Sequence, residues 1–516
     1  MVSNWEPTPQ ERAGLRNRWE YWKSLERAAR SCFYCRKPIH ITPAFKGESM
    51  GPDPSSPMWG YEMTYPLSCK SRLAEVCPSC SLRYGFDVDR LVQLGLEGDD
   101  ENVPATVSAN PQIFFTVTGP RFGPVHHAIE RKGHPGQCHP GPKRFCEHGV
   151  KISCNKIHRE KDPLIGTPMC PDCYDLEGHI LWNRHAPKLW NRTVRELERE
   201  LAKIVEPQMV KLAKILDVDR SELPNQIVVN CVKTAESQTR LAIHYHGFVR
   251  LDGPNGQGSA LTVKVSAAQL AKAFEVAARR VRVHETFTAS AEDLGLTEEE
   301  YYSSLEYDDE NSYVDENEYL GDDPHPIRCE FAWGEQIEVT VLNRETARRL
   351  TRYVVKYATK GATDAHGFAY RFRSVDQIDA LPDSAWWPKL LARTCWQMAD
   401  NARFARLNLR RSANTFGFNG HFLTKSRNWS VTFAALHTLR AKWAAEHADP
   451  ENPPEMNVPS WYFGNPDVSW RMVGKGWLTR LDAFEVRERF EVLQDGIRYE
   501  IALARDMRLS ELASVA

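Results

Sequence analysis

The chain has 516 residues, of which 42% are hydrophobic, and its charged side chains sum to a net charge of −2. This length predicts two to four domains with apolar cores of their own, and because no run of about 18 apolar residues occurs, a membrane-spanning segment is not expected. Thirteen cysteines without a recognisable secretory signal favour free or metal-bound thiols in a reducing cytoplasm over a disulfide framework.

Three Cys-x-x-Cys pairs occur in the first half of the chain. The first two pairs supply four thiolates, which is the ligand number and type of a structural zinc site: Cys32, Cys35, Cys77 and Cys80. Residues 36–76 would then form a long loop between the two halves of the site. We expect residues 1–105 to be a helical lead-in with a zinc-ribbon-like region.

A second group of possible zinc ligands lies between residues 138 and 173. It offers more donors than one tetrahedral ion needs: Cys138, Cys146, His148, Cys154, His158, Cys170 and Cys173. The third Cys-x-x-Cys pair, Cys170 and Cys173, is the preferred half of a site, with Cys146 and His148 as its partners. The other cysteines are expected to be ordinary buried thiols: Cys69, Cys231, Cys329 and Cys395.

A long helix is predicted over residues 181–217. Pro207 lies inside this segment, and a proline in a helix interior removes one backbone hydrogen bond and clashes with the preceding turn. We therefore expect the helix to break at Pro207.

Residues 225–253 have the pattern of a β-hairpin, with two apolar, β-branched runs separated by polar residues. Because side chains alternate between the faces of a strand, His244 and His246 project from one face and Tyr245 from the other. Two imidazoles on one face can hold one metal ion. A His-x-His pair also occurs by chance in a chain with 17 histidines, so the pair alone leaves a merely structural role open.

Charge is segregated along the chain. Residues 285–323 contain 15 acidic side chains and no Lys or Arg, so the other residues together carry a net charge of +13. The simplest interpretation is a solvated acidic insertion. The alternative is a mimic of nucleic acid that shields a basic cleft.

A helix is predicted over residues 343–361, because the asparagine at its start can cap the first turn and the glycine at its end can stop it. Tyr353 and Tyr357 are four residues apart and share one face. Lys356 and Lys360 share an adjacent face, so that each tyrosine heads a Tyr-x-x-Lys. Such a tyrosine pair serves packing more often than chemistry, and both roles stay open.

Between residues 389 and 442 ten Lys or Arg side chains accompany a single acidic one, interleaved with aromatic residues. Cations that displace counterions from phosphates and rings that stack on bases are what a surface for single-stranded or origin DNA requires. A helix would align the first three candidates on one face: Arg403, Arg406, Arg410, Arg411, Lys425 and Arg427. A solvated basic helix that packs through its aromatic rings is the alternative.

Four segments together resemble a known family: IFFTVTGPRFGPVH (113–126), AESQTRLAIHYHGFVRLDG (235–253), YVVKYATKG (353–361) and FGFNGHFLTKSRNWS (416–430). They resemble the replication initiator proteins of actinobacterial plasmids and integrative conjugative elements, from about residue 32 into the C-terminal region. Those initiators are histidine-hydrophobe-histidine (HUH) endonucleases of rolling-circle replication. Tyr245 is the middle residue of that motif here.

The resemblance implies a metal-assisted cleavage of origin DNA. His244 and His246 would bind Mg²⁺ or Mn²⁺, which polarises the scissile phosphate. A tyrosine would attack the phosphorus, leaving a 5′-phosphotyrosine and a free 3′-hydroxyl that a polymerase extends. Two tyrosines could alternate in opening and closing the strand, or only one could act; Tyr353 is then preferred, because Lys356 takes the place of the helper lysine.

Glu236 matches the position of the family's acidic third ligand. Hard cations favour oxygen donors, so a carboxylate beside two imidazoles is chemically reasonable. A tight two-residue turn at Gln238 and Thr239 would not place Glu236 on the histidine face, whereas a three-residue loop or a bulge would.

The resemblance also implies an α+β fold, in which a central antiparallel sheet carries the histidine strand in its middle, is flanked by helices and lies beside the tyrosine helix. The expected division is 1–105, then a nuclease core over 106–375 with a Cys/His-rich insertion at about 134–175 and an acidic one at about 285–325, then a helical region over 376–516. A nucleotide-phosphate loop is not recognised, so a host helicase is expected as a partner. The oligomeric state stays open.

Two other interpretations stay open. A conjugative relaxase or a transposase of the same catalytic class would use the same histidines and tyrosines on a different DNA. A zinc-stabilised DNA-binding regulator without nuclease activity would use the histidines only for structure.

Overall fold

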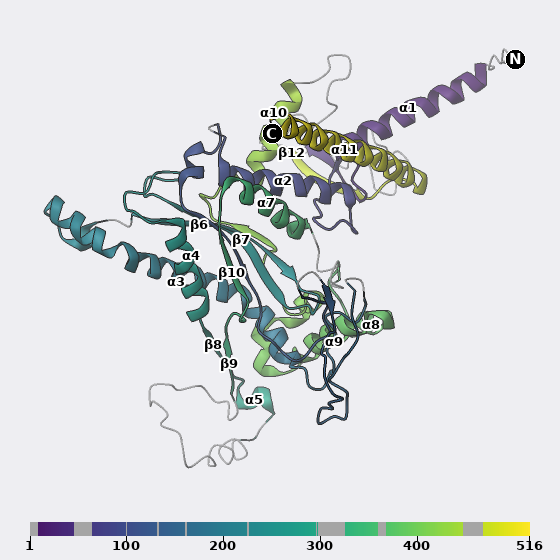
Figure 1. Cartoon of the computed structure of the whole chain (residues 1–516). Coiled ribbons are helices and arrows are strands. Elements are labelled where there is room, and N and C mark those ends of the chain that lie inside the picture. The colour runs from purple at the N-terminus through teal and green to yellow at the C-terminus, as the bar shows by residue number, and fades with distance from the viewer. Residues whose placement is uncertain are drawn as a thin grey trace. The chain divides into compact units, whose positions relative to one another are not determined.

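The computed structural model describes residues 9–45, 64–99, 101–131, 134–159, 162–223, 226–295, 297, 326–359, 368–446 and 468–515. The chain divides into two compact units (Figure 1). Residues 1–87 and 432–516 form the first unit, and residues 88–431 form the second. Over the described ranges, none of the helices has both the length and the apolar character that crossing a bilayer requires.

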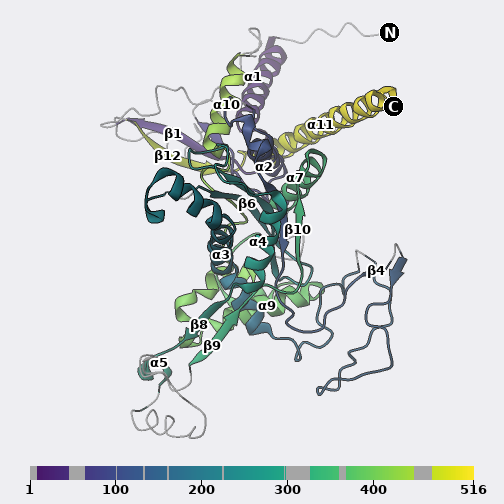
Figure 2. The same ribbon diagram turned by 60° about the vertical axis from the view of Figure 1, so that its left-hand side comes forward.

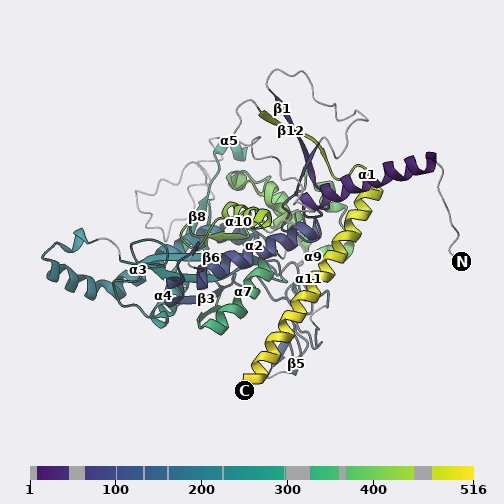
Figure 3. The ribbon, with the colours of Figure 1, turned by 90° about the horizontal axis from the view of Figure 1, so that it is seen from above.

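The first unit is built on an antiparallel sheet in the order β12-β1-β2. Its elements are α1 (Pro9–Ser31), β1 (Ile39–Phe45), β2 (Tyr65–Leu67), α10 (Phe433–Glu446), β12 (Val468–Lys475) and α11 (Arg480–Val515). Helix α11 begins beside α1, where the Tyr21 hydroxyl donates to the Asp482 carboxylate at 2.9 Å (Figure 3). Helices α1 and α11, which are far apart in the chain, therefore lie in one unit, whereas the predicted division separates residues 1–105 from residues 376–516.

The second unit is built on a five-stranded sheet in the order β10-β3-β7-β6-β11, in which each neighbouring pair is antiparallel. The strands are β3 (Gln112–Val117), β6 (Val228–Ser237), β7 (Ile243–Asp252), β10 (Ile337–Val341) and β11 (Leu423–Lys425). Strand β7 lies in the middle and is buried along its whole length. The predicted mixed class of helices with antiparallel sheets is confirmed.

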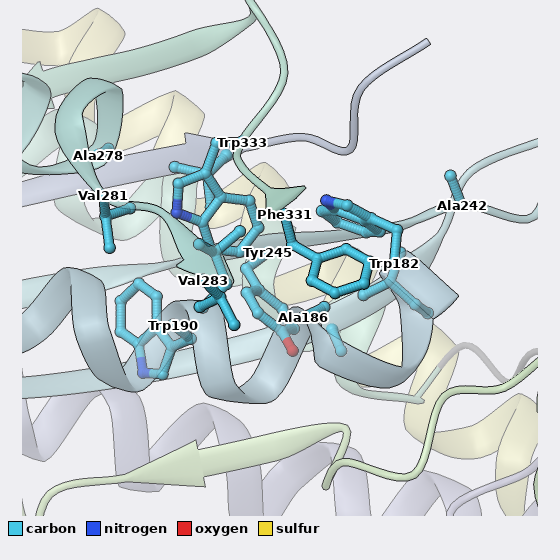
Figure 4. Close-up of a cluster of buried hydrophobic side chains, with 14 of the residues drawn as sticks. Trp182, Ala186, Trp190, Ala242, Tyr245, Ala278, Val281, Val283, Phe331 and Trp333 are labelled. Carbon is cyan, nitrogen blue, oxygen red and sulfur yellow. The ribbon is translucent and has the colours of Figure 1, made fainter. Parts of the chain in front are cut away.

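Helices α3 (Leu176–Leu216) and α4 (Ala267–Arg280) cover one face of this sheet. Tyr245 of β7 is buried there in an aromatic cluster, with its ring centroid 6.0 Å from that of Trp190 and 5.6 Å from that of Trp333 (Figure 4). Because side chains alternate along a strand, burying Tyr245 against α3 turns His244 and His246 to the opposite face. The apolar core thus orients the two histidines.

Helix α3 continues through Pro207, so the predicted break is wrong. Pro207 is exposed, while Leu201, Val205 and Met209 continue a buried stripe on the opposite side of the helix. A solvent-facing proline costs one backbone hydrogen bond but leaves this packing intact, because a helix can curve away from the side on which the ring crowds the preceding carbonyl. Tertiary packing therefore outweighs the local preference.

The further elements of the second unit are β4 (Ile129–Arg131), β5 (His134–Gly136), β8 (Val283–Phe287), α5 (Ala291–Leu294), β9 (Ile327–Phe331), α7 (Arg344–Thr359), α8 (Val375–Asp379) and α9 (Trp386–Met398). Helix α2 (Pro78–Glu97) contains the boundary between the units. Strands β8 and β9 form an antiparallel ribbon that leads to α5 (Figure 2). The acidic segment begins in this ribbon, and its residues 298–323 lie outside the described residues.

Candidate functional site

Strands β6 and β7 form the hairpin that carries the histidine pair. Glu236 lies directly opposite His244, and Thr234 lies opposite His246. The hairpin closes through a three-residue loop, 239–241, flanked by a hydrogen bond from the Gln238 amide to the Ala242 carbonyl at 2.9 Å. This is the loop length that places Glu236 on the histidine face, because residues opposite one another in an antiparallel pair share a face.

Three potential ligand atoms converge on that face. The Nε2 atom of His244 lies 2.8 Å from Oε2 of Glu236 and 2.7 Å from Nε2 of His246. The Nε2 atom of His246 lies 3.3 Å from the same carboxylate oxygen. These spacings approach the edge of about 3 Å expected between neighbouring ligands of a small octahedral ion with bonds of about 2.1 Å. One ion can therefore contact all three side chains.

A neighbouring strand holds His246 in this orientation. Thr116 of β3 lies opposite His246, and its Oγ1 is 2.9 Å from the ring Nδ1. The Phe114 ring stacks on the same imidazole with an interplanar angle of 9°. A metal-binding imidazole needs such a partner on its second nitrogen, because that bond sets the tautomer and the ring direction. Thr116 and Phe114 thus aim Nε2 of His246 at Glu236.

Burial sets the protonation of the cluster. It lowers the pKa of His246 to about 4, and the hydrogen bond to Glu236 offsets only part of this effect. Burial raises the pKa of Glu236, but hydrogen bonds from His244 and His246 outweigh it and bring this pKa below its usual value. At neutral pH the group therefore offers a neutral imidazole and an ionised carboxylate, which are the forms that bind a divalent cation.

Helix α7 lies against β6, the strand that carries Glu236. The Thr346 amide donates to Asn343 Oδ1 at 2.8 Å, which confirms Asn343 as the N-cap. Ala347, Thr351 and Val354 form the buried stripe of the helix. The backbone of the two predicted tyrosines belongs to α7, but the side chains of Tyr353 and Tyr357 lie outside the described residues, as does Lys360, whereas Lys356 is exposed.

The N-terminal cysteines form a buried group whose membership differs from the predicted set. The sulfur atoms of Cys35, Cys69, Cys77 and Cys80 all lie within 4.8 Å of one another. The distances are 3.8 Å from Cys77 to Cys35 and 3.7 Å from Cys69 to Cys80. A tetrahedral ion with Zn–S bonds of about 2.3 Å has sulfur atoms about 3.8 Å apart. This group can therefore hold zinc.

Cys32 lies beside that group but is not one of the four. Its Sγ donates to the Ala29 carbonyl at 3.5 Å, and burial raises its pKa to about 12. Both the burial and this hydrogen bond favour the protonated form of the Cys32 thiol. The backbone amides of Arg36 and Cys69 point instead at the sulfurs of Cys77 and Cys35, each at 3.2 Å, as amides do toward metal-bound thiolates.

The structure brings together the four residues predicted for the second site. The ligand atoms of Cys146, His148, Cys170 and Cys173 lie within 4.8 Å of one another, and Nδ1 of His148 is 3.2 Å from Sγ of Cys173. Cys170 is buried and the other three side chains are partly or fully exposed. Three thiolates and one imidazole form a complete zinc shell.

The predicted DNA-contacting residues do not share one helix. Arg403 and Arg406 lie in the 3₁₀ segment 402–407 and Arg410 lies in the 3₁₀ segment 409–415, with Asn408 in the left-handed conformation between them. The alignment on one helical face is therefore wrong, because a 3₁₀ helix repeats every three residues and the chain changes direction at residue 408.

The exposure of these cations differs. Four are exposed: Arg406, Arg410, Arg411 and Arg427. Arg410 pairs with Asp400 and lies over the Trp396 ring at 5.4 Å. Lys425 is half-buried and donates to three backbone carbonyls, among them that of Ser430 at 3.0 Å. Lys425 is thus engaged in holding the loop after β11.

Two side chains in these sites were not anticipated from the sequence. Cys69 belongs to no Cys-x-x-Cys pair, so the spacing of such pairs did not predict it as a metal ligand. The presence of five cysteines between residues 32 and 80 could have indicated that the fifth, Cys69, belongs to the group. Thr116 reaches His246 through pairing between strands 130 positions apart. A local pattern does not contain that information.

Fold and site define an α+β protein with a histidine–histidine–glutamate group on the central strand of an antiparallel sheet and cysteine-rich groups that can hold metal. The family of the replication initiator protein of pSAM2, RepSA, matches residues 21–296 and 314–487, and the chain belongs to this family. A replication initiator protein of Streptomyces ambofaciens is 32% identical over 393 residues, which cover 74% of this chain and 71% of that protein. No solved structure matches the chain.

Proposed function

We propose that this replication initiator nicks one strand of its origin DNA by a metal-assisted transesterification on a tyrosine. The observation that carries the proposal is the convergence of Glu236, His244 and His246 on one face of the central strand, within 3.3 Å of one another at their ligand atoms. Two imidazoles and one carboxylate leave positions open for a phosphate oxygen and water, as a catalytic site for Mg²⁺ or Mn²⁺ requires.

The bound cation would polarise the scissile phosphate and neutralise charge that develops on its oxygens. The side chains of the protein have separate tasks. Glu236 and His246 would hold the ion in a fixed place, since burial and Thr116 keep the His246 imidazole neutral and aimed at Glu236. An ion held there would orient the phosphate for attack by the tyrosine.

The nucleophile in this proposal comes from α7, which lies against β6. The hydroxyl oxygen of Tyr353 or Tyr357 forms a bond to the phosphorus, and the bond from phosphorus to the 3′-oxygen breaks. The tyrosine loses its proton and the leaving oxygen gains one, so the products are a 5′-phosphotyrosine and a free 3′-hydroxyl. A polymerase can extend that hydroxyl, and a host helicase would separate the strands.

The test is incubation of the full chain with Mn²⁺ and labelled single-stranded fragments of the origin region of its own element. We expect a protein–DNA adduct that survives denaturation and maps to Tyr353 or Tyr357. His244→Ala and the double variant Tyr353→Phe with Tyr357→Phe should abolish it. Tyr370→Phe, at an exposed tyrosine of the same unit, is the matched control and should leave the adduct unchanged.

Tight binding of origin fragments without an adduct would contradict the nuclease and favour the non-catalytic regulator. Adduct formation on transfer-origin or transposon-end DNA, but not on the replication origin, would favour a relaxase or a transposase. Each single tyrosine variant separates a one-tyrosine enzyme from one in which the two residues alternate.

We further propose structural zinc in the Cys35/Cys69/Cys77/Cys80 group and in the Cys146/His148/Cys170/Cys173 group, because both offer complete tetrahedral shells. Arg406, Arg411 and Arg427 are exposed and are proposed to contact DNA phosphates. Replacing each arginine by alanine should weaken binding to all sequences about equally and reduce its salt dependence.

A further inference from the structure

The cysteine-rich segment contains another group of four potential ligands. The ligand atoms of His126, Cys138, Cys154 and His158 all lie within 4.8 Å of one another. Nδ1 of His126 is 3.8 Å from Sγ of Cys138, and Nε2 of His158 is 3.4 Å from Sγ of Cys154. Cys138, Cys154 and His158 are buried. Two thiolates and two imidazoles at these distances match a Cys₂His₂ zinc shell.

Neighbouring groups orient two of these ligands. Nδ1 of His158 lies 2.7 Å from Oδ2 of Asp162. The other carboxylate oxygen of Asp162 accepts a hydrogen bond from the Leu164 amide at 3.0 Å. Carboxylate partners of this kind fix the tautomer and direction of metal-binding histidines. The His127 amide points at Sγ of Cys138 at 3.4 Å and so helps to fix the position of that sulfur atom.

We propose that this group binds a zinc ion of its own and that the segment 126–173 is a two-zinc module. The ligands of the two sites alternate in pairs along the chain. His126 and Cys138 belong to the first site, Cys146 and His148 to the second, Cys154 and His158 to the first, and Cys170 and Cys173 to the second. Each ion therefore closes a loop that contains ligands of the other.

In the described residues of this segment the apolar core is small and the strands are short. The buried apolar cluster that it forms consists of Cys138, Cys154 and Met169, and its described strands, β4 and β5, have three residues each. Short chains without a sufficient apolar core need metal ions or disulfides, and no disulfide joins the described cysteines of this segment. Two ions supply the missing cross-links.

The group of His126, Cys138, Cys154 and His158 also connects the two-zinc module to the β6–β7 hairpin of the proposed catalytic centre. The His126 amide donates to the Thr167 carbonyl at 2.9 Å, and the Gly166 amide donates to the His126 carbonyl at 2.7 Å. A Cβ atom added to Gly166 would lie 2.2 Å from the carbonyl oxygen of Thr239, in the loop that sets Glu236 opposite His244. Zinc at His126 thus supports the pairing register of the β6–β7 hairpin. The importance of this register for catalysis rests on the proposed function, whereas the zinc site itself does not.

A second possible group of metal ligands shares Cys138 with the proposed zinc site. Cys138 lies 3.0 Å from Nδ1 of His139 and could instead join His127 and His139. That group offers three ligands, whereas the group with His126 offers four and has the supporting carboxylate of Asp162. The pair His158→Ala and His139→Ala separates the two groups, because each removes one histidine that contacts a cysteine of the segment.

The experiment is the zinc content of the full chain, purified without chelator and measured by mass spectrometry. We expect three zinc ions per chain. Replacement by Co²⁺ should give sulfur-to-metal charge transfer equivalent to nine Co–S bonds, since the three groups contain nine cysteines. Two zinc ions and seven Co–S bonds in the wild-type chain would overturn the proposal, whether or not any variant folds.

The variants give a second measurement that is independent of DNA cleavage. His158→Ala and Cys138→Ser should each lower the zinc content by at least one ion, whereas His139→Ala should leave three. Loss of zinc in His139→Ala with retention in His158→Ala would overturn the assignment of ligands. If DNA cleavage is not found but three zinc ions are, the zinc proposal is supported and the nuclease proposal is contradicted.

Discussion

Thr116 contributes to the orientation of His246, because its Oγ1 lies 2.9 Å from the ring nitrogen that does not face Glu236. Thr116→Val keeps the shape of the side chain but removes this partner. We expect affinity for Mn²⁺ to fall by roughly 10- to 100-fold, since outer-shell partners of metal-binding histidines contribute about this much. Titration calorimetry measures the affinity.

Thr118→Val is the matched control for Thr116→Val. The Thr118 hydroxyl donates to the Gln336 carbonyl at 3.0 Å and so takes no part in the histidine group. Equal affinity for Mn²⁺ in the two variants would show that Thr116 does not position His246.

Lys233 is a buried cation on the other face of β6. It is 4% exposed, its Nζ lies 3.8 Å from the centre of the Tyr245 ring, and burial lowers its pKa to about 7. Between this pKa and the ordinary value of 10.5, the unfolded chain binds the proton and the folded chain does not, so stability rises with pH in this interval. The destabilisation is fully present below pH 7 and is lost as pH rises through 10.5.

Lys233→Met should therefore raise the free energy of unfolding near pH 7 and raise it much less near pH 10. The difference in the free energy of unfolding between the variant and the wild-type chain should fall by roughly 1.4 kcal/mol per pH unit from pH 7 to pH 10. The lost contact with the Tyr245 ring offsets part of the gain. Urea unfolding at both pH values measures it, with Lys211→Met, at an exposed lysine of α3, as control. A gain that does not depend on pH would contradict the buried-charge explanation.

At the scale of elements, the loop of the β6–β7 hairpin is set by its contact with the cysteine-rich segment. Gly166 has a φ of +84° and no room for a Cβ beside Thr239. Gly166→Ala should destabilise the second unit by about 1–3 kcal/mol and weaken binding of Mn²⁺, because the loop must move. Gly256→Ala, at a φ of +103° with nothing within 4 Å, carries the backbone strain without the collision.

Thermal unfolding and calorimetry of the two glycine variants distinguish these effects. The loss of Mn²⁺ affinity should appear in Gly166→Ala alone. Equal behaviour of the two variants would mean that the contact with Thr239 does not support the hairpin.

The N-terminal cysteine group gives a direct comparison between the sequence pattern and the structure. Cys69→Ser should lower the zinc content by one ion per chain, whereas Cys32→Ser should leave it unchanged, because the Cys32 thiol is protonated and bonded to a carbonyl. The zinc content of each purified variant measures this. Zinc loss in Cys32→Ser with retention in Cys69→Ser would restore the set derived from the Cys-x-x-Cys pairs.

At the scale of the whole molecule, charge is separated between the acidic segment and the rest of the chain. The segment begins in β8 and continues to residue 323, ahead of β9, and β8 pairs with β9 from Val283 with Phe331 to Phe287 with Ile327. Exchanging residues 298–323 for a short Gly/Ser linker should leave the ribbon folded and remove 12 negative charges.

We expect that exchange to strengthen and accelerate binding of DNA of any sequence at low salt, with the gain disappearing at high salt, because the effect is long-range electrostatics. Fluorescence anisotropy across a salt series measures it. A variant of full length in which Asn and Gln replace the acids separates charge from length. Unchanged binding in both variants would show that the segment is a solvated insertion without effect on DNA.

Local patterns in the sequence were sufficient for several parts of this protein. The alternation around Tyr245 predicted that His244 and His246 share a face, and Asn343 was predicted as the N-cap of its helix. The four residues proposed for the Cys146 group, chosen from the sequence, lie together in the structure. Each of these depends on residues that are near in the chain or on a repeating periodicity. The replication initiator family was likewise recognisable from four short segments.

Only the tertiary structure decided the remainder. The sulfur atom of Cys69, and not that of Cys32, lies with those of Cys35, Cys77 and Cys80. This grouping, the contact of Thr116 with His246, the continuous helix through Pro207 and the pairing of β1 with β12 all depend on contacts between distant parts of the chain. Such contacts are chosen by the burial of apolar surface and the satisfaction of polar groups in the assembled fold. The interleaving of the two groups of potential metal ligands in residues 126–173 is of the same kind, because side chains from separate positions in the chain come together there in space.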